Sequence, residues 1–137
     1  MTQENVKSQG NVYNKNTDIN ANTTLDLYDT GRQLNVSGNA ALTVTLPPVA
    51  DARAGWSALV LFSSNHSHVL QINGDDSGIL YGMIRSSGSV AAAAGDDSAT
   101  ITANPMGLNV VGSTIEVFCD GSLWHIRGET PNGVTIA

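Results

Sequence analysis

Apolar and polar residues alternate with a period of two over much of the chain that follows Leu25. The clearest alternating runs are residues 33–36, 42–46, 70–73 and 115–119. Such alternation is typical of strands that bury one face. Residues 56–62 are nearly all apolar, as in a strand that is covered on both faces. The pattern therefore predicts a chain of short β-strands.

Turn-forming residues separate these runs at short intervals. The pair Asp120-Gly121 stands between two alternating segments and predicts a β-hairpin. Helical spacing is confined to residues 49–54 and 90–94, and residues 86–98 have the least regular pattern of the body. We therefore predict an all-β fold, an antiparallel β-sandwich or jelly-roll-like small barrel.

The first 24 residues differ from the rest, because Asn, Gln, Thr and Ser dominate them. Their scattered apolar side chains are Val6, Val12, Tyr13 and Ile19. By itself such a segment buries too little apolar surface to offset its ordering entropy. One interpretation is a disordered tail. The other is a flexible arm whose four apolar residues contact a neighbouring subunit or capsid, for instance by adding a strand to a sheet edge. We expect an arm over residues 1–24 and a β-domain over residues 25–137.

Charged residues make up only 13% of the 137 positions, about half the usual share, whereas 41% are hydrophobic. A surface of small neutral polar groups repels copies of itself weakly, which favours assembly. The net charge is −6, and no lysine follows residue 24. An acidic body without a basic stripe indicates that nucleic acid is not a partner. We also expect no membrane span and no signal peptide, because the apolar runs are short and the N-terminus is polar.

Few residues suggest chemistry. His66 and His68 would point to one face of a strand and could bind a metal ion together, but a turn is the plainer home for both. The pairs Asp75-Asp76 and Asp96-Asp97 lack the spacing of a calcium loop. Cys119 alternates with apolar residues, as a buried small side chain does. No nucleophile elbow, phosphate loop or dinucleotide motif occurs, so we predict a protein without catalytic residues, cofactor or required metal.

The two tryptophans are the largest apolar groups of an aromatic-poor chain. Trp56 opens the apolar segment, and Trp124 follows the Asp-Gly turn. We predict that both are core anchors, with an interface role as the alternative.

Several motifs together resemble small β-domains of tailed-bacteriophage virion proteins, namely capsid decoration (cement) proteins and tail fibre or spike segments. The similarity covers about residues 22–128. Its motifs are Asn22-Thr23-Thr24-Leu25, Asp29-Thr30-Gly31-Arg32-Gln33-Leu34-Asn35-Val36, Thr43-Val44-Thr45-Leu46-Pro47, Gly55-Trp56 and Glu116-Val117-Phe118-Cys119-Asp120-Gly121-Ser122-Leu123-Trp124-His125-Ile126.

The resemblance implies a structural virion protein that is made in the host cytoplasm and ends on the capsid surface. Its expected partners are the major capsid protein and two further copies of itself, in a homotrimer that stabilises the assembled shell. The alternative is a tail fibre or spike module that recognises a host-surface receptor, and an exposed aromatic and polar pocket would favour it. A carbohydrate-active enzyme on a β-fold is a third possibility.

Overall fold

The computed structural model describes residues 15–37, 42–63, 69–73, 79–86, 89–102, 111–130 and 134–136. Most of this part of the chain is in β-strands. The strands are β1 (Lys15–Ile19), β2 (Thr23–Thr24), β3 (Arg32–Val36), β4 (Leu42–Thr45), β5 (Ser57–Phe62), β6 (Val69–Asn73), β7 (Leu80–Ser86), β8 (Ser89–Asp96), β9 (Ser98–Thr102), β10 (Thr114–Cys119), β11 (Trp124–Glu129) and β12 (Val134–Ile136). Two single turns of helix complete it, η1 (Leu27–Asp29, 3-10) and α2 (Val49–Ala52). The all-β prediction is confirmed.

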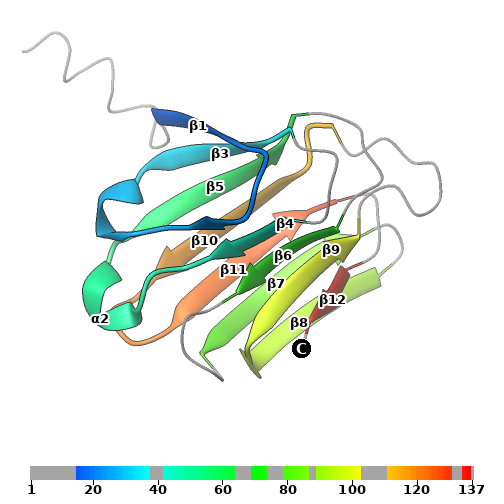
Figure 1. The fold of residues 1–137 in the computed structure, drawn as a ribbon. Coiled ribbons are helices and arrows are strands. Elements are labelled where there is room, and N and C mark those ends of the chain that lie inside the picture. Colours follow the sequence, from blue (N-terminus) through cyan, green and yellow to red (C-terminus); the bar gives the residue numbers. More distant parts are fainter. Residues whose placement is uncertain are drawn as a thin grey trace, which may run out of the picture.

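The strands form two sheets (Figure 1). One has seven strands in the order β1-β3-β5-β10-β11-β7-β8, and the other has five in the order β12-β9-β6-β4-β2. Buried side chains from both sheets belong to one hydrophobic cluster, so the sheets pack face to face as in a sandwich.

The first six strands are wound as a coil. The chain visits the seven-stranded sheet at β1, β3 and β5 and the five-stranded sheet at β2, β4 and β6. Because it crosses to the other sheet after every strand, neighbours within one sheet run in the same direction, and all four of these pairs are parallel. Corresponding residues stack from turn to turn, as Ile19, Val36 and Phe62 do.

Among the later connections, β7 to β8 and β10 to β11 are hairpins, whereas those from β8 to β9, β9 to β10 and β11 to β12 cross between the sheets. The predicted hairpin at Asp120-Gly121 joins β10 to β11 as an antiparallel pair. Five of the ten pairs within the described residues are parallel, the fifth being β7 with β11. The antiparallel part of the prediction is thus corrected. The alternation of apolar and polar residues shows which side chains face the core. It does not show strand direction, because parallel and antiparallel strands have the same period of two and the connections decide the direction.

The core lies between the sheets and contains both predicted anchors. Trp56 is 3% exposed and Trp124 is fully buried. Their rings meet edge to face, with 5.1 Å between centroids and 88° between planes, a favourable arrangement for an aromatic pair. The indole N–H of Trp56 donates to the carbonyl of Asp26 at 3.1 Å, whereas that of Trp124 has no acceptor among the described residues.

The predicted arm loses its last ten residues to the body. Residues 15–19 form β1, which pairs with β3, and residues 23–24 form β2, which pairs with β4. Ile19, expected as an arm contact, is 1% exposed and belongs to the core cluster. The sequence pattern did not predict β1, because Ile19 is the one apolar residue of this strand and because β1 pairs with β3 through backbone hydrogen bonds. Val6, Val12 and Tyr13 lie outside the described residues.

The two segments with helical spacing have different structures. Residues 49–52 form α2, but residues 90–94 lie within β8. The alanine run there favours a helix intrinsically, yet pairing with β7 along the edge of the sheet overrides that preference. The irregular pattern of residues 86–98 thus contains the whole of the edge strand β8 and the first residue of β9.

Candidate binding surface

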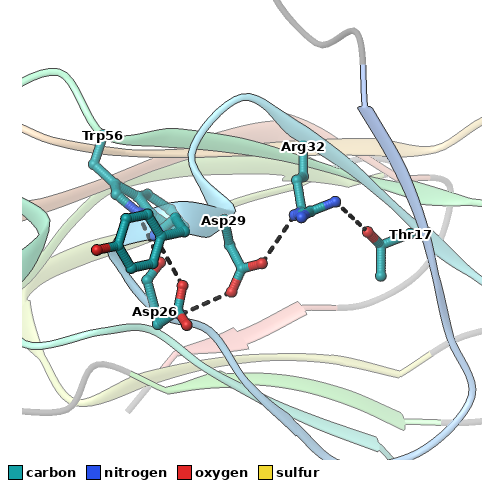
Figure 2. Close-up of polar contacts among 6 residues, drawn as sticks. Thr17, Asp26, Asp29, Arg32 and Trp56 are labelled. Carbon is teal, nitrogen blue, oxygen red and sulfur yellow. Dashed lines mark hydrogen bonds and ion pairs between the residues drawn. The ribbon is translucent and has the colours of Figure 1, made fainter.

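A group of polar contacts at the turn between β2 and β3 ties the first coil together (Figure 2). We call it the turn network, made of Thr17, Asp26, Asp29, Arg32 and Trp56. Asp26 caps η1, because its carboxylate accepts a hydrogen bond from the backbone N–H of Tyr28 at 2.8 Å. In return, the backbone N–H of Asp26 donates to Asp29 Oδ2 at 2.8 Å. This reciprocal capping box fixes the turn.

Arg32 extends the turn network to the edge strand. Its Nε donates to Asp29 Oδ1 at 2.9 Å, and its Nη1 donates to Thr17 Oγ1 on β1 at 3.2 Å (Figure 2). Both charged side chains are partly shielded, with 30% exposure for Arg32 and 24% for Asp29. The turn network therefore connects β1, η1 and β3. It also includes Trp56, which is the residue just before β5.

The motif Asp29-Thr30-Gly31-Arg32 has a structural explanation in this turn. Thr30 Oγ1 accepts a hydrogen bond from the N–H of Ser57, and the N–H of Gly31 donates to the carbonyl of Ser57. Gly31 has φ of 80°, a value that favours glycine. The contacts of these residues hold the chain where one turn of the coil meets the next, so we assign the motif to folding and not to ligand binding.

A second polar group lies on the outer face of the seven-stranded sheet. Ile115, Val117 and Cys119 of β10 point into the core, so the residues between them point outward. Pairing with β11 sets Phe118 opposite His125 and Glu116 opposite Arg127. We call these four side chains, with Asp120 of the hairpin turn, the face row.

The members of the face row contact one another in sequence. His125 Nε2 lies 2.7 Å from Asp120 Oδ2, and the His125 ring stacks on Phe118 with 5.1 Å between centroids and 13° between planes. The guanidinium carbon of Arg127 lies 5.4 Å from the centre of the same Phe118 ring, within cation–π range. Arg127 also donates from Nε and Nη2 to Glu116 Oε1, at 2.7 and 2.6 Å. The result is a continuous strip of charge and aromatic surface.

Asp120 is the one group of the described chain with a clearly shifted acidity. The hydrogen bond from His125, followed by those from the backbone N–H groups of Ser122 and Leu123, lowers the pKa of Asp120 from 3.8 to about 2. The two backbone contacts are 2.8 Å long and close the hairpin turn. Asp120 thus serves both the turn and the face row.

A groove of about 620 Å³ spans β5, β10, β11 and β7, and four members of the face row, Glu116, Phe118, His125 and Arg127, are part of its lining. Its size falls within the range of small-molecule sites. Half-buried Leu59 and Met83, which is 57% exposed, contribute apolar surface. Arg85 and Glu129 add opposite charges from paired positions of β7 and β11. The groove therefore combines apolar surface with hydrogen-bond donors and acceptors on a floor of paired strands.

A smaller hollow of about 530 Å³ lies beside α2 and Trp56. Arg53 borders it with φ of 64° and ψ of 172°, a strained conformation for a residue with a side chain. Leu27, at 43% exposure, lies on its other side. Apart from Arg53, Asp51 and Thr30, its lining is apolar or small, so it offers a ligand fewer polar contacts than the groove does.

The candidate residues of the sequence do not gather into this site. Trp56, Trp124 and Cys119 are buried, Ile19 is in the core, and His66 and His68 lie outside the described residues. The side chain of Asp96 accepts a hydrogen bond from the backbone N–H of Ala94, so it serves the end of β8. Across the described ranges, no three His, Cys, Asp or Glu side chains come together in a group that could hold a metal ion.

The sequence reasoning missed the face row although a signal for it existed. Once Asp120-Gly121 is taken as a hairpin turn, counting back and forward along the strands pairs Phe118 with His125 and Glu116 with Arg127. Cross-strand pairs of this kind are the units that stabilise a sheet surface. The groove, in contrast, is formed partly by β7. Its parallel pairing with β11 is not predicted by any local pattern in the sequence.

No protein family model, curated protein or solved structure matches this chain. None of the helices in the described part of the chain is long and apolar enough to cross a membrane.

Proposed function

We propose that this chain is a structural protein of a tailed-phage virion and decorates the outer surface of the capsid as a homotrimer. The observation that carries the proposal is the place where the chain enters the body. Lys15 begins β1, and β1 is an edge strand of the seven-stranded sheet, beside β3 (Figure 1). The polar residues 1–14 therefore precede an edge strand in the chain.

A segment that precedes an edge strand is well placed to reach a neighbouring subunit. Val6 and the adjacent residues Val12 and Tyr13 supply three apolar side chains. A neighbour's sheet edge would supply backbone hydrogen bonds, and pockets beside it would accept these side chains. Attachment to the assembled shell alone would stabilise that shell by mass action. The low content of charged residues supports the close approach of several copies.

The test is a truncation that ends just before β1, the first strand of the described residues. Removal of residues 2–14 leaves β1 complete, whereas a cut beyond residue 14 would remove strand residues and finally Ile19 from the core. We expect the truncated chain to keep its melting temperature within a few degrees. We expect its attachment to capsids of the phage that encodes it to weaken by at least about tenfold, as for a loss of about 1.4 kcal/mol.

A matched variant distinguishes the effect of the three apolar side chains from the effect of the length of the segment. Val6→Ser, Val12→Ser and Tyr13→Ser together keep the segment but remove its three anchors, and should weaken attachment comparably. Co-sedimentation with purified capsids gives the affinity, and electron microscopy of decorated particles gives the position and copy number. Undiminished attachment of both variants would refute the role of the segment, and no attachment of the intact chain would refute the capsid proposal.

A second candidate function is a tail fibre or spike module that recognises a host-surface receptor. The groove favours it, because an exposed site with aromatic and polar surface is what such recognition needs. Binding of the intact chain to host cells but not to capsids would select this function instead.

A further inference from the structure

The groove lined in part by the face row retains polar groups that the fold leaves unused. Arg85 and Glu129 are exposed, and neither side chain makes a hydrogen bond or ion pair within the described residues. The Nη1 atom of Arg127 and the Nδ1 atom of His125 take no part in the contacts of the face row. Donors and acceptors thus lie side by side on β11 and β7, above a backbone that is already fixed by pairing.

We propose that this groove binds an uncharged saccharide. The proposal goes beyond the capsid role and stands whether or not the chain attaches to a shell. A sugar hydroxyl both donates and accepts, so it is matched by guanidinium groups next to a carboxylate. The C–H faces of a sugar ring are apolar and pack on side chains such as Leu59 and Met83, which border the same groove.

The balance of charge argues for an uncharged ligand. The titratable groups that line the groove are Arg85, Arg127, Glu116, Glu129 and His125. Two arginines face two carboxylates, so neither an anion nor a cation meets a site of uniform opposite charge. A ligand with many hydroxyl groups meets donors on Arg85 and Arg127 and an acceptor on Glu129.

The dimensions argue for a small ligand. A volume of about 620 Å³ accommodates a short oligosaccharide, within the range of ligand sites in proteins. The floor is formed by four adjacent strands, β5, β10, β11 and β7, so the polar groups are held by paired backbone and not by a loop. Little ordering is then required on binding.

The experiment uses the intact chain on an array of immobilised oligosaccharides that includes neutral hexose, N-acetylhexosamine and sialylated chains. The neutral oligosaccharide with the strongest signal is then titrated by calorimetry. Arg85→Ala and Glu129→Gln should each weaken its binding by about tenfold, the factor for one lost hydrogen bond of about 1.4 kcal/mol. Arg53→Ala is the matched control, because Arg53 is an exposed arginine outside the groove, and its binding should equal that of the unaltered chain.

Two results would overturn the inference. One is the absence of neutral oligosaccharide binding at millimolar concentration on the array and in ligand-observed nuclear magnetic resonance. The other is binding that is restricted to sialylated chains and abolished by salt, which would show an anion site. Failure of capsid attachment would leave the sugar titration unaffected, so the two proposals fail separately.

Discussion

The turn network and the face row each contain an arginine–carboxylate pair, yet the two pairs have different roles. The two carboxylates are equally shielded, with 24% exposure for Asp29 and 23% for Glu116. Their partners differ. Asp29 also accepts the backbone N–H of Asp26, and Arg32 reaches across to β1. Arg127 instead is 71% exposed, and it contacts Glu116 and Phe118 on the neighbouring strand of the same hairpin.

The comparison teaches that an ion pair by itself does not reveal its role. A pair that also caps a backbone group of its turn and reaches a side chain far away in the sequence fixes the path of the chain. A pair that joins side chains across strands already paired adds little to the fold, because exposed ion pairs contribute about 0–1 kcal/mol. Such a pair remains available for contact with a ligand.

The largest expected effect concerns the tryptophan pair, which underlies both regions. Trp124 neighbours His125 of the face row, and its ring contacts Trp56, which is bonded to Asp26 of the turn network. Trp124→Ala should lower the free energy of unfolding by about 3–5 kcal/mol, because a large buried ring leaves a cavity. Chemical denaturation gives this value, and hydrogen exchange at residues 26–32 should show a loosened turn network.

Trp124→Phe is the control, because it keeps an aromatic ring and removes an indole N–H that has no acceptor among the described residues. Its loss of stability should be clearly smaller. An equal loss in both variants would mean that the indole N–H is important to the fold, contrary to the observed geometry.

The next prediction tests the turn network directly. Asp29→Ala removes the acceptor of both the Asp26 N–H and Arg32 Nε. We expect the free energy of unfolding to fall by about 0.5–2 kcal/mol, the usual cost of removing a helix-capping contact. Denaturant titration measures the change. A loss below about 0.5 kcal/mol, the range of ordinary surface substitutions, would place the turn network with the face row as a surface feature.

The matched change in the face row is Glu116→Ala. It breaks the ion pair with Arg127 but leaves the hairpin pairing of β10 and β11 in place. We expect the free energy of unfolding to change by no more than about 0.5 kcal/mol. The same denaturant titration as for Asp29→Ala applies. A loss as large as that of Asp29→Ala would abolish the distinction between the two regions.

The two regions also differ in how far the sequence predicts them. The face row follows from local information, because Asp120-Gly121 sets the hairpin and the hairpin sets its pairs. The core anchors Trp56 and Trp124 follow from size and apolar context. The turn network does not, because Arg32 meets Thr17 only through parallel pairing of β1 with β3. Polar strands such as β1 carry no hydrophobic period, and the direction of pairing leaves no trace in alternation.

The smallest expected effect concerns Asp120, which belongs to the face row yet also contacts the backbone. Its pKa of about 2 in the folded chain lies below its ordinary value of 3.8. A depressed carboxylate pKa stabilises the folded state above the unfolded pKa, and this contribution is lost as the pH falls through the folded pKa. The stability difference between the unaltered chain and Asp120→Asn should therefore be constant above about pH 4, since 3.8 is the unfolded value, and shrink between about pH 4 and pH 2.

The cause can be tested with His125→Phe, which keeps a ring opposite Phe118 and removes the largest contribution to the low pKa. The pKa of Asp120 should then rise from about 2 toward 3.8 but not reach it, because the N–H groups of Ser122 and Leu123 still donate to its carboxylate. Carboxyl chemical shifts followed by nuclear magnetic resonance during an acid titration measure both values. If the pKa stays at about 2, the turn backbone alone holds the charge of Asp120. Asp120 would then belong with residues like Asp29, whose contacts fix the chain, and the face row would begin at His125.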